Sequence, residues 1–179
     1  MGNVEQEYLK QSGGELRRLK NLADQAIDQV SVANLYTSLD ENGNCIAVLM
    51  KHVAGFLESH WTDFLDSNGG KPDWRREREF FIEEGESSEV ILAKWERGWR
   101  ALFGAIHSLR QDDLLRRVSI GGRSLTVLRA IQLSLSHLAQ HVGQIVFLAK
   151  HMKGCDWKPL SSPLSEAADS TAVLVEQEC

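Results

Sequence analysis

Hydrophobic residues recur at three- and four-residue intervals in four long segments, which is the spacing of one face of an α-helix. This pattern predicts helices over residues 5–38, 45–65, 88–108 and 126–153. The first of them contains the Gly13-Gly14 pair, where we expect a bend or an interruption, because a glycine destabilises a helix interior by up to about 1 kcal/mol.

Two connections between these helices have patterns of their own. Residues 66–86 break the helical periodicity with a Gly/Pro stretch and a charged run, and a connection of this length is typical of a functional rim or lid. Residues 114–126 alternate apolar and polar side chains around Gly121-Gly122, which predicts a small β-hairpin. The order of elements predicts an all-α fold, an up-down four-helix bundle with a β-hairpin before the last helix.

Length, charge and cysteine content narrow the class of protein. The 179 residues fit one domain, which we assign to 1–157, and we expect residues 158–179, which lack a helical pattern, to be a mobile tail. The net charge of −5 argues against nucleic acid or an anionic membrane as the main partner. Without a signal-peptide pattern, a membrane-spanning apolar run or paired cysteine motifs, the chain is expected to be cytoplasmic with free thiols.

The clearest sign of chemistry is a pair of histidines, His137 and His141, four residues apart in the last helical segment. This spacing stacks both imidazoles on one helix face, with Cβ atoms about 6 Å apart. His52 lies in the second apolar segment. If the two helices pack with these faces inward, three neutral nitrogens meet inside the bundle. Three such ligands leave positions open for water or substrate, as in a catalytic metal site.

The other histidines lie too far along their helices, or at a helix end, to join this group. His60 lies about 12 Å along the helix from His52, and His151 about 15 Å beyond the pair, at about 1.5 Å per residue. His107 stands at the end of the third helix, where a charged imidazole interacts favourably with the helix dipole. The glutamate of the HExxH motif is missing, so zinc-protease chemistry is not expected. Elimination leaves His52 as the third candidate, and the alternative is that these histidines are ordinary polar residues.

Three motifs follow one another over about residues 5–155: Lys51-His52-Val-Ala-Gly55, then Trp61-Thr-Asp-Phe-Leu65 with Gly69-Gly-Lys-Pro72, and His137-x-x-x-His141-Val-Gly-Gln-Ile145. With them the chain resembles the DinB/YfiT-like superfamily of four-helix-bundle metal proteins, and more narrowly a bacterial branch of unknown function. The resemblance implies that His52, His137 and His141 bind nickel, zinc or another divalent ion. Members of that branch often have asparagine where this chain has Phe56, whose ring cannot form the same hydrogen bond.

The same resemblance implies an activity on a small-molecule substrate. Characterised members of the superfamily include transferases and isomerases that use mycothiol, bacillithiol or glutathione, and others are described as hydrolases. We therefore expect a thiol-dependent S-transferase with an external low-molecular-weight thiol, or a metal-activated hydrolase. The open metal position would hold thiolate or water.

For several other residues the sequence allows two roles. Gln144 either supports His141 through a hydrogen bond or is an ordinary polar residue between helices. Arg75, Arg76 and Arg78 can bind an acidic cosubstrate, although their mixed-charge surroundings favour a solvated loop.

A non-enzymatic function is the alternative hypothesis. In it the chain is a helical-bundle homodimer or binding module with a structural metal, and apolar surface around Trp95 and Trp99 serves self-association. The i, i+4 spacing of these tryptophans equally fits packing in the core.

Overall fold

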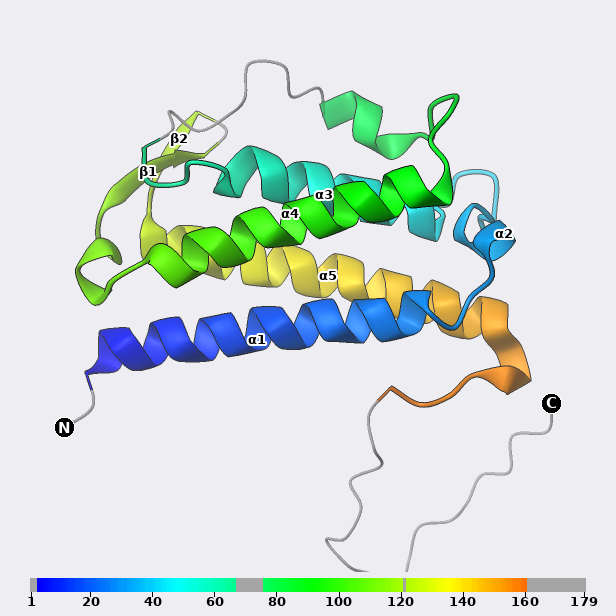
Figure 1. Ribbon diagram of the computed structural model, residues 1–179, viewed down its shortest axis with the longest axis horizontal. Helices are drawn as coiled ribbons and strands as arrows, with labels where there is room; N and C mark the ends of the chain where they lie inside the picture. Colours follow the sequence, from blue (N-terminus) through cyan, green and yellow to red (C-terminus); the bar gives the residue numbers. More distant parts are fainter. Residues whose placement is uncertain (1–2, 67–75, 121, 161–179) are drawn as a thin grey trace, which may run out of the picture.

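The computed structural model describes residues 3–66, 76–120 and 122–160, and this part of the chain is mostly helical. Four long helices lie side by side (Figure 1): α1 (Val4–Ile27), α3 (Ile46–Trp61), α4 (Ser88–Ser108) and α5 (Val127–Lys153). A short helix, α2 (Val32–Leu35), follows α1. Three 3-10 turns complete the helical part: η1 (Arg76–Phe80), η2 (Gln111–Asp113) and η3 (Gly154–Asp156).

The predicted hairpin is confirmed. Strands β1 (Arg117–Ile120) and β2 (Arg123–Thr126) pair antiparallel, with Val118 opposite Leu125. Thr126 then caps α5, because its Oγ1 accepts a hydrogen bond of 3.2 Å from the backbone N–H of Arg129. The hairpin therefore leads directly into the helix that carries the histidine pair.

Two predicted helices end earlier than the hydrophobic pattern indicated. The first prediction, 5–38, is wrong beyond Ile27, because Ser31 caps a separate helix by accepting a hydrogen bond of 3.2 Å from the N–H of Asn34. The second, 45–65, ends at Trp61, where the chain turns through Asp63 at a φ of 50°. By contrast, α4 has the predicted bounds.

The expected break at Gly13-Gly14 does not occur, and α1 runs through both residues. Gly13 is buried, and the place of its missing side chain lies 3.5 Å from Ile106 of α4. Packing of α1 against α4 outweighs the low helix propensity of glycine here.

Helices α3 and α4 approach each other closely at Gly98. A Cβ atom at that position would lie 2.9 Å from both the Cα and the carbonyl oxygen of Ala54. This contact fixes the distance between the two helices, and α3 carries His52. The position of one candidate ligand therefore depends on a glycine in a neighbouring helix.

Trp95 and Trp99 belong to the core. Their side chains are 1% and 0% exposed, and the indole N–H of Trp95 donates a hydrogen bond of 2.9 Å to Asp24. The idea that these two tryptophans form an exposed surface for self-association is therefore wrong, because the packing of α4 against α1 and α3 covers them. The expected homodimer remains a prediction.

Two further predictions concern the ends and the cysteines. Residues 161–179 of the expected mobile tail lie outside the described part, while Lys158 forms two hydrogen bonds, of 2.8 and 2.9 Å, with Gln29, just after the end of α1. Cys45 is a buried free thiol, as predicted. The prediction of free thiols is wrong for Cys155, which is disulfide-bonded; spacing along the chain could not reveal this, because bonded cysteines need only meet in space.

None of the described helices has the length and apolarity that crossing a bilayer requires.

Candidate metal centre

Helices α3 and α5 bring the three predicted histidines together. One ring nitrogen from each of His52, His137 and His141 lies within 4.8 Å of the other two. The ring centroids are 4.7 Å apart for His52 and His141 and 4.5 Å apart for His137 and His141. Nitrogens bound to one zinc ion stand roughly 3.3 Å apart, given bonds of about 2.0 Å. Small side-chain shifts therefore suffice for the three histidines to hold one metal ion.

Glu79 orients His52. The Nδ1–H of His52 donates a hydrogen bond of 2.9 Å to the carboxylate of Glu79, and both side chains are buried. With its proton on Nδ1, the imidazole presents Nε2 as the free ligand atom. A carboxylate behind a histidine is the usual device that fixes ring orientation and raises ligand basicity in metal sites. Glu79 could not be predicted as a partner of His52, because it lies in a connection whose path the hydrophobic pattern does not specify.

Gly55 provides the space that Glu79 occupies. A Cβ atom at Gly55 would lie 1.8 Å from Oε1 of Glu79, far inside van der Waals contact. Gly55 stands one turn after His52 on α3, so the absence of a side chain there opens a path to His52 Nδ1. A glycine in the interior of a buried helix was the sequence signal for this close approach.

Gln144 orients His141 in the same way. The Nδ1–H of His141 donates a hydrogen bond of 2.8 Å to the amide oxygen of Gln144, which leaves Nε2 for a metal. Burial lowers the pKa of His141, with a smaller lowering from the nearby His52, while the hydrogen bond to Gln144 acts in the opposite direction. A lowered pKa keeps the imidazole neutral, which is the form that binds metal.

Two phenylalanines enclose the histidine rings. Phe56 of α3 packs on His137 with ring centroids 4.1 Å apart, and Phe80 of η1 stacks on His52 at 4.9 Å. Phe56 thus makes an aromatic contact with a candidate ligand. The two rings restrict the motion of the imidazoles against which they pack.

The segment that carries Glu79 is anchored to α3 by a buried ion-pair cluster. Lys51 Nζ lies 2.6 Å from a carboxylate oxygen of Glu86 and donates a second hydrogen bond of 3.0 Å to the carbonyl of Phe81. Glu86 also accepts hydrogen bonds from Lys94 and from the N–H of Glu83. Burial alone would raise the pKa of Glu86, but these hydrogen bonds together lower it to about 2.

This cluster predicts a loss of stability in acid. Because the pKa of Glu86 is lowered from 4.5 to about 2, its contribution is complete above pH 4.5 and disappears as the pH falls toward 2. The free energy of unfolding should fall by up to about 3 kcal/mol over that interval from this group. Denaturant unfolding at pH 7 and pH 2 measures it. Lys51→Met should reduce the pH dependence, whereas the exposed Lys10→Met should not; equal dependence in both variants would refute the assignment.

Of the three proposed arginines, only the side chain of Arg78 is described, and it pairs away from the histidines. Arg78 is exposed and forms an ion pair of 2.8 Å with Glu83. Arg76 begins η1, and Arg75 lies outside the described residues. Their role in binding a cosubstrate stays untested. His60 lies, as predicted, outside the histidine cluster; it is partly buried, and its Nδ1 lies 2.7 Å from the carbonyl oxygen of Phe56.

A cavity of about 460 Å³ adjoins the candidate metal centre. His52 and His137 form part of its wall, and the rest comes from α3, the hairpin and the first turns of α5. Most of its other lining side chains are apolar. A small molecule in this cavity would reach the histidines from the hairpin side.

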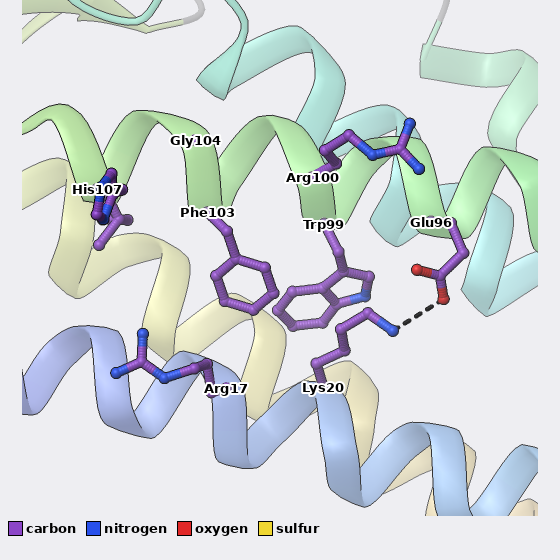
Figure 2. Close-up of a pocket in the computed structure, with 9 residues that line it drawn as sticks. Arg17, Lys20, Glu96, Trp99, Arg100, Phe103, Gly104 and His107 are labelled. Atoms are coloured by element: carbon purple, nitrogen blue, oxygen red, sulfur yellow. Dashed lines mark hydrogen bonds and ion pairs between the residues drawn. The ribbon is translucent and has the colours of Figure 1, made fainter.

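A larger cavity, of about 570 Å³, lies between α1 and α4 (Figure 2). Trp99 and Phe103 line it together with Lys20 and Glu96, which form an ion pair of 2.8 Å. None of the three clustered histidines lines it. The histidine cluster therefore adjoins the smaller of these two cavities.

The fold and the site define a mostly helical protein with a three-histidine cluster close enough to bind a metal ion. The chain belongs to the family described as "Protein of unknown function (DUF1572)", whose model matches residues 3–166. The match includes all three histidines and Glu79. No curated protein and no solved structure matches the chain.

Proposed function

We propose that the protein is a metal-dependent enzyme of the DinB/YfiT-like kind, in which the four long helices form an up-down four-helix bundle. His52, His137 and His141 bind one divalent ion, nickel, zinc or a similar metal. The observation that supports this most strongly is the convergence of three imidazole nitrogens within 4.8 Å, on two helices.

The donor set suits catalysis better than a purely structural role. Three neutral imidazoles leave a divalent ion with most of its charge and with an open position. When bound, the ion would lower the pKa of a coordinated water toward ~7 or stabilise a thiol as thiolate. The described cysteines stand outside the histidine cluster, and Cys45 is buried, so a reacting thiol would come from an external low-molecular-weight compound.

The residues of the chain would perform the positioning. Glu79 and Gln144 hold the Nδ1 protons of His52 and His141, which leaves the Nε2 of each ring available as a ligand atom. Phe56 and Phe80 pack against the rings of His137 and His52 and so limit their rotation. We favour a thiol S-transferase, with metal-activated hydrolysis as the second activity, and both use a small-molecule substrate.

Activity assays on protein of defined metal content test the proposal. Metal-free and reconstituted protein would be compared with an aryl halide plus glutathione for thiol transfer, and with an activated ester for hydrolysis. Turnover of either kind should require the metal and should disappear in His137→Ala. A stoichiometric metal with no turnover of any thiol or ester substrate would favour the structural-metal alternative.

A further inference from the structure

We propose that the substrate of this site is an amphipathic anion, whose apolar body fills the cavity beside the histidines and whose anionic group is bound by Arg123. The inference rests on the proposed function, because it takes the histidine cluster as the reactive end of the cavity. It adds the chemical class of the molecule that enters.

The walls of the cavity are suited to an apolar body. Phe56 of α3, Leu125 of β2 and Leu133 of α5 line it from three different elements. Leu133 is 39% exposed, so apolar surface is open to solvent next to the buried His52. A ligand without apolar atoms would leave this surface in water, whereas an alkyl or aryl group would cover it.

Arg123 is the residue that selects for negative charge. It lies in β2, is exposed, and lines the same cavity as His52 and His137. No aspartate or glutamate is among the described residues that line the cavity. A guanidinium in this setting can bind a carboxylate or a phosphate through two parallel hydrogen bonds.

A second arginine of the hairpin shows the contrast. Arg117 of β1 donates hydrogen bonds to the hydroxyl and the carbonyl oxygen of Ser124, at 3.1 and 3.4 Å. For Arg123 the described part of the chain contains no such hydrogen bond or ion pair. The two arginines carry the same charge and belong to the same hairpin. Of the two, only Arg123 lines the cavity, and its guanidinium has no hydrogen-bond acceptor within the described part of the chain.

The binding of matched pairs of small thiols to the cobalt-loaded protein tests this proposal. The probes are ω-mercaptoalkanoates of increasing chain length, from mercaptopropionate to mercaptooctanoate, each beside the alcohol of equal length. Binding is followed by the thiolate-to-cobalt absorption band. At the length that spans the cavity, the wild type should bind the acid about three- to fivefold more tightly than the alcohol, as expected for one exposed charge pair.

The variants assign the preference to one residue. Arg123→Gln should bind acid and alcohol equally, while Arg117→Gln should keep the preference of the wild type. Equal affinities at every length in the wild type, or a preference that survives Arg123→Gln, would overturn the assignment of the anion site and leave the metal centre intact. Failure of cobalt to bind in any form of the protein would instead overturn the proposed function and this inference with it.

Discussion

Replacing Gly55 by alanine should weaken metal binding by roughly 10- to 100-fold, the usual effect of losing the group that supports a metal-bound histidine. The added methyl group would occupy a place 1.8 Å from Oε1 of Glu79, so the carboxylate must leave His52. The end of a glutamate side chain moves more easily than a helix backbone, and alanine favours helix more than glycine does. The fold should therefore survive while the affinity falls, as measured by competition with a chelating dye.

Two further variants separate loss of orientation from general damage. Gly143→Ala adds the same methyl group to the helix that carries His137 and His141, at a place with no atom within 4 Å, and should leave the affinity unchanged. Glu79→Gln should reproduce the direction of the Gly55→Ala effect without a steric clash. Wild-type affinity in both Gly55→Ala and Glu79→Gln would show that Glu79 does not support the ligand.

Replacing Gly98 by alanine should destabilise the protein by about 1–3 kcal/mol, the range typical of overpacking a close contact. The new Cβ would lie 2.9 Å from two backbone atoms of Ala54, which cannot rotate away as a side chain can. Helices α3 and α4 would have to separate, and this strain exceeds the gain in helix propensity. The unfolding midpoint in heat should fall by about 2–4 °C for each kcal/mol lost.

Gly104 offers a matched control on the same helix. A Cβ atom there would meet nothing within 4 Å, so Gly104→Ala should raise the free energy of unfolding by up to about 1 kcal/mol through propensity alone. Opposite signs for the two substitutions would confirm that the close approach to α3 matters. Equal stabilisation by both would contradict the packing described here.

The histidine cluster could be predicted from the sequence because its main feature is local. His137 and His141 share a helix face by virtue of spacing alone, and the apolar pattern places His52 on a second buried helix. Glu79 could not be predicted, since its contact with His52 spans 27 residues and depends on how the segment after α3 folds back. That path is set by Lys51 and Glu86, whose pairing leaves no periodic trace in the sequence.

At the helix ends, too, hydrophobic periodicity predicts some features and not others. Apolar periodicity continued past Ile27, but the local hydrogen bond at Ser31 started a new helix, and hydrophobic patterning does not record such caps. Gly13-Gly14 indicated a break that packing against α4 prevented. Gly55 and Gly98, in contrast, mark positions where another group approaches closely, although the sequence alone does not say which group.

The central claim, that three histidines bind one metal ion, is tested most directly by elemental mass spectrometry on untagged protein. Wild type, His137→Ala and His60→Ala would be reconstituted with nickel or zinc and freed of excess ion. We expect about one ion per chain in the wild type and in His60→Ala, whose histidine lines the same cavity but stands outside the cluster, and none in His137→Ala. A wild type that binds no ion after reconstitution, or a His137→Ala variant that binds as much, would contradict the account.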